Sequence, residues 1–259
     1  MKISLRSVSF LGVPRGASVD YSALTLNTAA TGLMAWYDAS QLVLNDGDLV
    51  ATWTDKSTPA GATVTSSTTK PTYKTNIVNG KPIVRFTASV TSMARNGAVF
   101  PTGDTTVVIV LNATTDVTNP TVTYPIGWGS SGAGSSAWFY VAGVTAFGGS
   151  SLWGANNSAD SGPNWGFAAT CYNAFHVLVC TKTGTSWKWY RDNVTAFSKT
   201  MTTNTTNTGS MFIGCRPGPT EFFTGDIAEI GVYNRVVSST ELSNIIGLLG
   251  YKYGLTVTP

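Results

Sequence analysis

The sequence contains few charged residues. Aspartate, glutamate, lysine and arginine make up 11% of the 259 residues, against roughly 25% in an average globular protein. Hydrophobic residues make up 42%, which is enough to form a core and excludes an intrinsically disordered chain. The net charge of +3 is small and the lysines and arginines are scattered, so we predict no binding to nucleic acid.

Cysteines and long apolar runs are also scarce. Cys171, Cys180 and Cys215 are an odd number without C-x-x-C spacing, which argues against a disulfide framework or a zinc site and favours small buried side chains in strands. No apolar run approaches the roughly 20 residues of a membrane-spanning helix, so we predict no membrane insertion. Arg6 interrupts the apolar stretch near the amino terminus, and residues 1–32 are interpreted as native sequence rather than a secretory signal.

Residues that could catalyse a reaction are rare as well. His176 is the single histidine, and no Ser-His-Asp or metal-ligand spacing surrounds it, so a general base has no visible partner. Asp226 and Glu229 are three positions apart and would point to opposite faces of a regular strand. We expect both to accept hydrogen bonds from loop backbones at the edge of a sheet. The sequence therefore predicts no catalytic residue.

The chain does contain a regular series of turn signals with short apolar segments between them. Among these segments, Thr105–Leu111 and Phe175–Cys180 are suited to a buried strand, and Trp187–Arg191 alternates between two faces. The pattern predicts an all-β fold, a jelly-roll sandwich of two stacked antiparallel sheets. The turn signals are Asp46-Gly47, Asn79-Gly80, Asn96-Gly97, Thr102-Gly103-Asp104, Asn119-Pro120, Gly148-Gly149, Gly162-Pro163, Asp192-Asn193 and Gly218-Pro219.

One helix is expected, close to the carboxy terminus. Ser238 and Glu241 have the spacing of a capping box, and Gly254 is suited to end the helix. Four apolar residues of residues 238–250 fall on one helical stripe, and they are Leu242, Ile245, Ile246 and Leu249. Before this helix, Ile227, Ile230 and Val232 alternate with small and polar residues, as in a strand with one buried face.

The motifs of these segments resemble a known family. The strand F-T-G-D-I-A-E-I-G-V-Y-N-R at 223–235 and the helix end Y-K-Y-G at 251–254 are similar to the carboxy-terminal signature of the concanavalin A-like lectin/glucanase superfamily, in its laminin G-like branch. W-Y-D-A-S at 36–40 and W-T-D-K-S at 53–57 resemble the opening of that family. W-Y-R-D-N at 189–193 resembles its Y-x-D-G strand end, with Asn193 at the glycine position, where we expect a left-handed turn. The likeness runs from Leu33 to Leu255 and implies a concanavalin A-like domain at 33–259.

The resemblance raises two kinds of chemistry. Laminarinase-type members present carboxylates as E-x-D-x-E or E-x-D-x-x-E on one strand, and none of the three glutamates, Glu221, Glu229 and Glu241, starts such a pattern. Laminin G-like relatives often hold calcium, for which the candidate ligands are the aspartates at 104, 116 and 160, but no D-x-D-x-D cluster exists. We predict no cofactor and no metal site, with a structural calcium ion as the alternative. At the position of His176 the resemblance implies a packing role.

A stretch without lysine or arginine, residues 96–181, is the candidate ligand-binding region. It is rich in Gly, Ser, Asn and aromatic residues, and sugars bind by stacking on aromatic rings while amides and backbone groups bind the hydroxyls. The alternative is that the rings belong to the core or to a subunit interface, which we prefer for Trp138 and Tyr140. The predicted glycan-binding residues, in apparent loops, are Trp153, Asn156, Asn157, Asn164 and Trp165.

Residues 1–32 are interpreted as an amino-terminal arm. They contain little apolar sequence and would either cover an edge of the sandwich or add a strand to a partner. The leading hypothesis is a non-enzymatic structural protein of a tailed-phage virion, a capsid decoration, head fibre or tail component, that is anchored to other virion subunits through residues 1–32. It would self-associate or bind host-surface polysaccharide. The alternatives are a secreted or cell-surface bacterial carbohydrate-binding module and a glycoside hydrolase.

Overall fold

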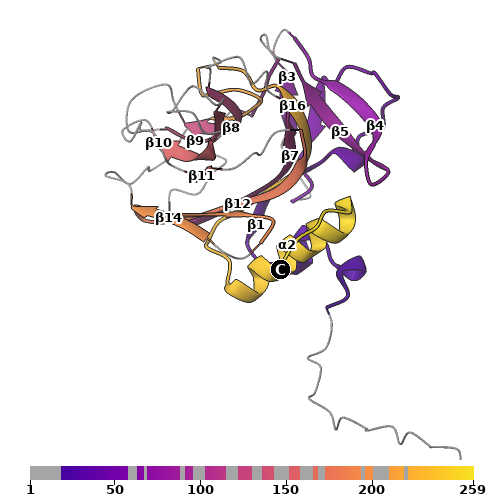
Figure 1. Cartoon of the computed structure of the whole chain (residues 1–259). Coiled ribbons are helices and arrows are strands. Elements are labelled where there is room, and N and C mark those ends of the chain that lie inside the picture. The colour runs from indigo at the N-terminus through magenta and orange to yellow at the C-terminus, as the bar shows by residue number, and fades with distance from the viewer. Residues whose placement is uncertain are drawn as a thin grey trace, which may run out of the picture.

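The computed structural model contains two stacked antiparallel sheets and a carboxy-terminal helix (Figure 1), so the predicted jelly-roll sandwich is confirmed. The description covers residues 19–57, 63–66, 69–87, 91–95, 103–114, 122–129, 136–142, 152–157, 166–168, 173–193, 196–200, 210–218 and 221–259. Within these residues no helix is long and apolar enough to cross a membrane.

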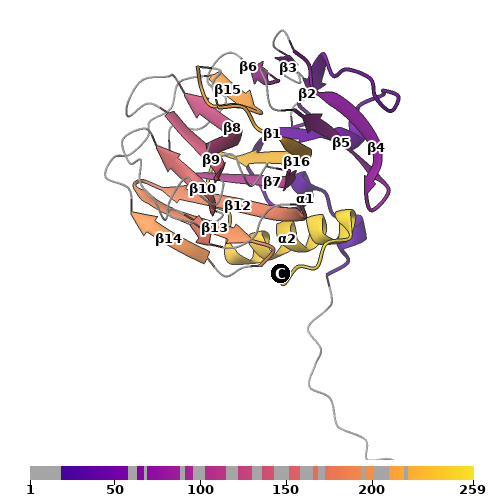
Figure 2. The ribbon, with the colours of Figure 1, turned by 45° about the horizontal axis from the view of Figure 1, so that its top comes forward.

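The first sheet has eight strands in the described part of the chain, and helix α2 runs along it, below the sheet in the view of Figure 2. Its order is β14-β13-β12-β7-β16-β5-β4, with β1 also paired to β16. The bounds are β1 Leu33–Asp38, β4 Thr72–Val78, β5 Lys81–Phe86, β7 Thr105–Ala113, β12 Phe175–Thr183, β13 Ser186–Arg191, β14 Ala196–Thr200 and β16 Gly225–Tyr233.

The second sheet also has eight strands within the described ranges, in the order β11-β10-β9-β8-β15-β6-β3-β2. The bounds are β2 Thr52–Thr54, β3 Thr63–Ser66, β6 Met93–Arg95, β8 Val122–Gly129, β9 Ser136–Ala142, β10 Leu152–Asn157, β11 Gly166–Ala168 and β15 Ser210–Ile213. Among the described residues, the helical elements are η1 Tyr21–Ala23, α1 Leu26–Ala29, η2 Ala39–Gln41 and α2 Ser239–Tyr253.

Two cores explain why the central strands are apolar along their whole length. One core lies between the sheets, where the Tyr37 and Trp53 rings meet edge to face and the Trp187 and Trp189 rings stack. The other lies between the first sheet and α2. Strands β7 and β16 are therefore covered on both faces and are almost continuously buried.

Helix α2 forms as its sequence predicts and ends three residues later than 250. The Ser238 Oγ accepts a hydrogen bond from the Glu241 backbone N–H, and the Glu241 carboxylate accepts one from the Ser238 N–H, which confirms the capping box. All four residues of the predicted stripe are buried against the sheet. Gly254 adopts the left-handed conformation, with φ 63°, and caps the last turn.

Strand β16 departs from a regular strand. Its pairing with β7 shifts between Ile227 and Glu229, and Ile227 and Ile230, three residues apart, both face the core between the sheets. Asp226 and Glu229 consequently lie on the same, helix-facing side, so the prediction of opposite faces is wrong. Their predicted partners are also wrong, because β16 is an interior strand. Asp226 accepts two hydrogen bonds from the guanidinium of Arg85, and Glu229 is bound by side chains alone.

Residues 19–32 of the predicted arm pack against α2 and β16. Leu26 is fully buried, and its backbone carbonyl accepts a hydrogen bond from the Tyr233 hydroxyl at 2.8 Å. Gly247 of α2 permits this contact, because a Cβ there would lie 2.2 Å from the ring of Tyr21. This part of the chain therefore covers the helix side of the sandwich, and residues 1–18 lie outside the described range.

Other local predictions were mixed. Cys180 and Cys215 are free and buried as expected, with burial raising the pKa of the Cys215 thiol to about 11, while Cys171 lies outside the described residues. The left-handed turn after β13 falls on Asp192, with φ 56°, and not on Asn193. His176 does have a partner that its sequence neighbours could not reveal, because its Nδ1 lies 2.6 Å from the Asp192 carboxylate.

Candidate functional site

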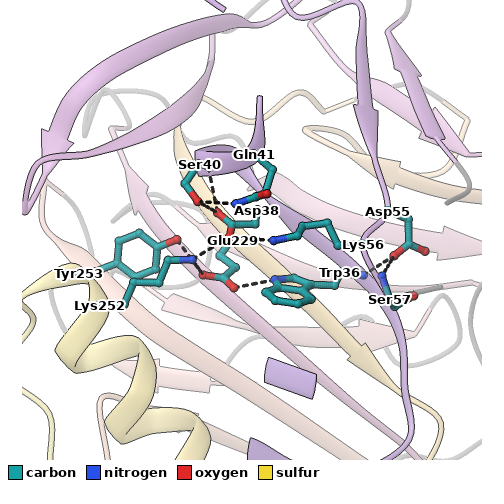
Figure 3. Close-up of polar contacts among 10 residues, drawn as sticks. All are labelled: Trp36, Asp38, Ser40, Gln41, Asp55, Lys56, Ser57, Glu229, Lys252 and Tyr253. Carbon is teal, nitrogen blue, oxygen red and sulfur yellow. Dashed lines mark hydrogen bonds and ion pairs between the residues drawn. The ribbon is translucent and has the colours of Figure 1, made fainter. Parts of the chain in front are cut away.

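Three ionisable side chains meet between α2 and the first sheet (Figure 3). The Lys252 ammonium donates hydrogen bonds to Asp38 Oδ2 at 2.9 Å and to Glu229 Oε2 at 2.7 Å. Asp38 ends β1, Glu229 follows the irregularity of β16, and Lys252 lies in the last turn of α2. We call these three residues the ion cluster.

The remaining oxygens of the ion cluster are also bound. Glu229 Oε1 accepts a hydrogen bond from the Trp36 indole N–H at 2.7 Å, and Oε2 accepts a second one from the Tyr253 hydroxyl at 2.8 Å. Asp38 Oδ1 accepts hydrogen bonds from the backbone N–H and the hydroxyl of Ser40. Asp38 and Glu229 are only 3% and 2% exposed, so every carboxylate oxygen is bound within the protein rather than presented to solvent.

The electrostatics of the two carboxylates differ. Burial raises the pKa of Glu229 above its ordinary value, and the charge of Asp38 adds to this, although Lys252 opposes it. At Asp38 burial has the same raising effect, but the charge of Lys252 and the hydrogen bonds from Ser40 and Lys252 outweigh it and lower the pKa. The same two carboxylates outweigh the burial of Lys252 and raise the pKa of its ammonium. All three charges depend on one another.

This arrangement is suited to fastening the helix rather than to catalysis. A glycosidase needs one carboxylic acid that reaches the glycosidic oxygen and one carboxylate that reaches the sugar or a water. In the ion cluster, both carboxylates are buried and bound to Lys252. The chemistry that the cluster performs is to bind α2 to β1 and β16 through charged hydrogen bonds.

A hollow of about 260 Å³ lies beside the ion cluster. The Lys56 ammonium lies 4.2 Å from the centre of the Trp36 ring and 3.8 Å from Asp38 Oδ2 at its wall. Asp55 holds this wall in place, because it accepts hydrogen bonds from the backbone N–H groups of Trp36 and Ser57. The lining residues are Leu24, Thr25, Leu26, Trp36, Asp38, Ser40, Gln41, Lys56, Glu229, Leu248 and Lys252.

Each residue of the ion cluster lies in one of the sequence motifs that resemble the family, and those motifs predicted only the fold. Asp38 belongs to the W-Y-D-A-S motif, Glu229 to the strand motif at 223–235, and Lys252 to the helix end Y-K-Y-G. The residues are up to 214 positions apart, as Asp38 and Lys252 are. No spacing rule connects them, so their meeting could be found only in the structure.

The predicted glycan-binding residues lie elsewhere, and only part of the set is described. Trp153, Asn156 and Asn157 are on strand β10 rather than in a loop, while Asn164 and Trp165 lie outside the described residues. In the register, Asn157 is opposite Ala137, which is opposite the core residue Trp128. The positions of Trp153 and Asn157 therefore share one face of the sheet, and Asn156 lies on the other.

Two further aromatic residues of the 96–181 stretch can be placed. Tyr124 and Trp128 belong to the core between the sheets, in line with the alternative interpretation. Among the metal candidates, Asp104 accepts a hydrogen bond from the Gly184 backbone N–H, whereas Asp116 and Asp160 are outside the described ranges. Within the part of the chain that is described, no group of three or more His, Cys, Asp or Glu side chains could hold a metal ion.

The chain was compared with protein families, curated protein sequences and solved structures. The family model described as the concanavalin A-like lectin/glucanases superfamily matches residues 87–243, more than half of the chain. No curated protein sequence matches the chain.

Several solved structures share the fold. A GH54 α-L-arabinofuranosidase has a TM-score of 0.63 at 12% identity, over 79% of this chain and 51% of its own. Domain 4 of AbnA, a GH43 extracellular arabinanase from Geobacillus stearothermophilus solved with arabinotriose, has a TM-score of 0.59 at 14% identity, over 85% of this chain and 98% of the domain. Trypanosoma rangeli sialidase scores 0.54 at 15% identity, over 88% of this chain and 34% of its own. The chain thus spans about half of the arabinofuranosidase and about a third of the sialidase.

Proposed function

Because the chain belongs to the concanavalin A-like lectin/glucanase superfamily, we propose that it is a carbohydrate-binding protein without glycosidase activity. The ion cluster is the observation that supports the absence of glycosidase activity. Its two carboxylates border the hollow of about 260 Å³, yet they are only 3% and 2% exposed, and each is bound by Lys252 and by further donors rather than free to act as an acid or a base.

Carbohydrate binding is supported by the arabinanase domain that shares the fold. That domain was solved in complex with arabinotriose, and this chain covers nearly all of it. The residues proposed for glycan contact remain Trp153, Asn156, Asn157, Asn164 and Trp165. On β10, Asn156 lies on the face opposite to Trp153 and Asn157, so a single contact surface would use either Asn156 or the other two. Aromatic stacking and amide hydrogen bonds are the interactions by which such residues would hold a sugar.

Purified protein is expected to release no reducing sugar from β-glucans, galactans or arabinans, because the ion cluster has no free acid and base. Glu229→Gln should leave this result unchanged. A thermal melt of the variant is the control for folding. Turnover by the wild-type protein that disappears in a folded Glu229→Gln variant would contradict the non-enzymatic proposal.

We further propose that the protein is displayed on the virion of a tailed bacteriophage, as a decoration, head fibre or tail component. A sequence with few charged residues and many Thr, Ser, Asn and Gly residues supports this, together with the amino-terminal segment that precedes the sandwich. This step is an analogy with other virion proteins that use the same domain type. Of the predicted arm, residues 1–18 would contact neighbouring virion subunits, because residues 19–32 pack against α2 and β16 of the same chain.

The virion proposal predicts that mass spectrometry of purified particles detects the protein. Deleting residues 1–18 should abolish incorporation while the thermal melt stays close to that of the full chain, because Leu26 and Tyr21 remain in place. The matched control is the alanine variant of exposed Val43, which should incorporate normally. Absence of the protein from particles would contradict the virion proposal. Normal incorporation of the truncated chain would contradict an anchoring role for residues 1–18.

A second candidate is a carbohydrate-binding module of a bacterial extracellular protein. The observation that favours it is the likeness to a single domain of an extracellular arabinanase. Detection of the protein in a culture medium free of phage particles would favour this candidate over the virion.

A further inference from the structure

A second hollow, of about 550 Å³, lies along α2 and adjoins the hollow beside the ion cluster. The two share Leu24, Leu248 and Lys252. We call the larger one the α2 groove. Its volume is within the range of about 300–1,000 Å³ that is typical of ligand pockets. It is lined by Tyr21, Ser22, Leu24, Asn79, Lys81, Leu248, Tyr251 and Lys252.

The walls of the α2 groove are held by specific contacts. On one side, the absence of a side chain at Gly247 lets the Tyr21 ring lie against the helix. On the other, the β4–β5 turn is fixed by positive φ angles at Asn79 and Gly80. The Asn79 amide then donates a hydrogen bond to the Lys252 carbonyl at 3.2 Å, which ties this turn to the end of α2. The groove is therefore formed before any ligand binds.

The lining combines an aromatic ring with hydrogen-bonding groups. Tyr251 is 61% exposed, so its ring is available for stacking. Asn79 and Ser22 supply an amide and a hydroxyl, while Leu24 and Leu248 supply apolar contacts. Carbohydrate recognition requires an aromatic ring that stacks on the C–H face of a sugar and a few polar groups that bind its hydroxyls.

The charge of the groove is positive. Lys252 and Lys56 together balance the charges of Asp38 and Glu229, because Lys252 pairs with both carboxylates and Lys56 lies 3.8 Å from Asp38 Oδ2. Lys81, in contrast, is exposed and takes part in no salt bridge within the described part of the chain. None of the described residues that line the groove is acidic. The groove therefore carries one uncompensated ammonium and favours a ligand with a negative charge.

We propose that the α2 groove binds a carboxylate-bearing saccharide, with a sugar ring stacked on Tyr251 and its carboxylate paired with the Lys81 ammonium. Uronic and sialic acids supply the same chemistry. The ligand class rests on the proposed carbohydrate-binding function, but the site is separate from Trp153 and its neighbours.

The test is calorimetric titration of the full chain with trigalacturonate, a glucuronate trisaccharide and sialyllactose, each beside an uncharged counterpart. At least one acidic probe should bind more tightly than its counterpart. Its affinity should fall at high salt, because a partly exposed ion pair is screened. Tyr251→Ala and Lys81→Gln should each weaken binding by about tenfold or more, as residues that dominate a contact do.

Control variants distinguish binding in the α2 groove from binding elsewhere on the surface, and failure of the groove proposal from failure of the proposed carbohydrate-binding function. Lys70→Gln and Val43→Ala change exposed residues outside the groove and should leave affinity unchanged. Loss of binding in a Trp153→Ala variant, with the groove variants unaffected, would overturn the groove and keep the carbohydrate-binding function. Binding of neutral probes alone would have the same meaning. No binding to any probe, or to any member of a broad array of neutral and acidic glycans, would overturn both proposals.

Discussion

Replacing Lys252 with alanine is expected to lower the free energy of unfolding by about 3–5 kcal/mol, the cost of removing one partner from a buried ion pair. The substitution leaves Asp38 and Glu229 buried without their shared cation, and it also removes a link between α2 and the first sheet. Chemical denaturation at pH 7 measures the loss. A change below about 1 kcal/mol would show that the ion cluster does not fasten the helix.

The loss in Lys252→Ala should depend on pH in a defined direction. Without Lys252, burial is the main influence on Glu229 and raises its pKa further above the ordinary value of 4.5. A folded state with a raised pKa binds protons more tightly than the unfolded state, so stability is retained below about pH 4.5 and lost as the pH rises through the folded-state pKa. The variant should therefore be closest to wild type in acid.

A matched variant separates lost charge compensation from lost packing. In the background Asp38→Asn with Glu229→Gln, the two carboxylates are replaced by neutral amides. Adding Lys252→Met then removes the remaining ammonium and keeps a side chain of similar length. Replacing a whole buried ion cluster by neutral groups is often tolerated. We therefore expect Lys252→Met to cost much less in this background than in the wild-type chain. Equal costs in the two backgrounds would assign the effect of Lys252 to packing.

Gly225→Ala is expected to destabilise the protein by about 2–6 kcal/mol, because two separate effects add. Gly225 begins β16 with φ 152°, a conformation that side-chain-bearing residues rarely adopt. A Cβ at this position would also lie 2.3 Å from the Asn112 carbonyl oxygen and 3.0 Å from the Ala113 Cα, which are backbone atoms of β7. Neither atom can move without breaking the pairing of the two strands.

Substitutions at two other glycines separate the cost of the backbone conformation from the cost of the contact with β7. Gly103 has open space around a built Cβ, so Gly103→Ala should change the unfolding free energy little. Gly47 also has open space but has φ 90°, so Gly47→Ala reports the conformational cost alone. Thermal or chemical unfolding of the three variants gives the comparison. A loss in Gly225→Ala no larger than in Gly47→Ala would remove the role assigned to the contact with β7.

Much of the fold could be predicted from local patterns. The capping box of Ser238 and Glu241 and the apolar stripe of α2 depend on residues three or four positions apart, so they are visible in the sequence. The Asn79-Gly80 turn is similarly local, because both residues accept positive φ angles at low cost. Motif resemblance then linked these elements to one family, which the match over residues 87–243 supports.

The candidate site could not be predicted in the same way. Alternation along 225–233 predicts that Asp226 and Glu229 face apart, and a single irregularity in the pairing of β16 with β7 reverses this. Whether a strand accommodates such an extra residue depends on its neighbour in the sheet, which the local pattern does not contain. The same limit applies to His176, whose partner Asp192 lies across a hairpin.

By itself, then, the sequence determined features whose interactions are short in range, namely the Asn79-Gly80 turn, the buried central strands and the capped helix. It also determined the shortage of candidate catalytic residues. The tertiary structure alone decided that Asp38, Glu229 and Lys252 form one buried ion cluster and that Tyr21, Asn79 and Tyr251 line one groove. The physical reason is that these side chains come from elements far apart in the chain. Their meeting depends on how the sheet, the helix and residues 19–32 pack together, and no local periodicity encodes that packing.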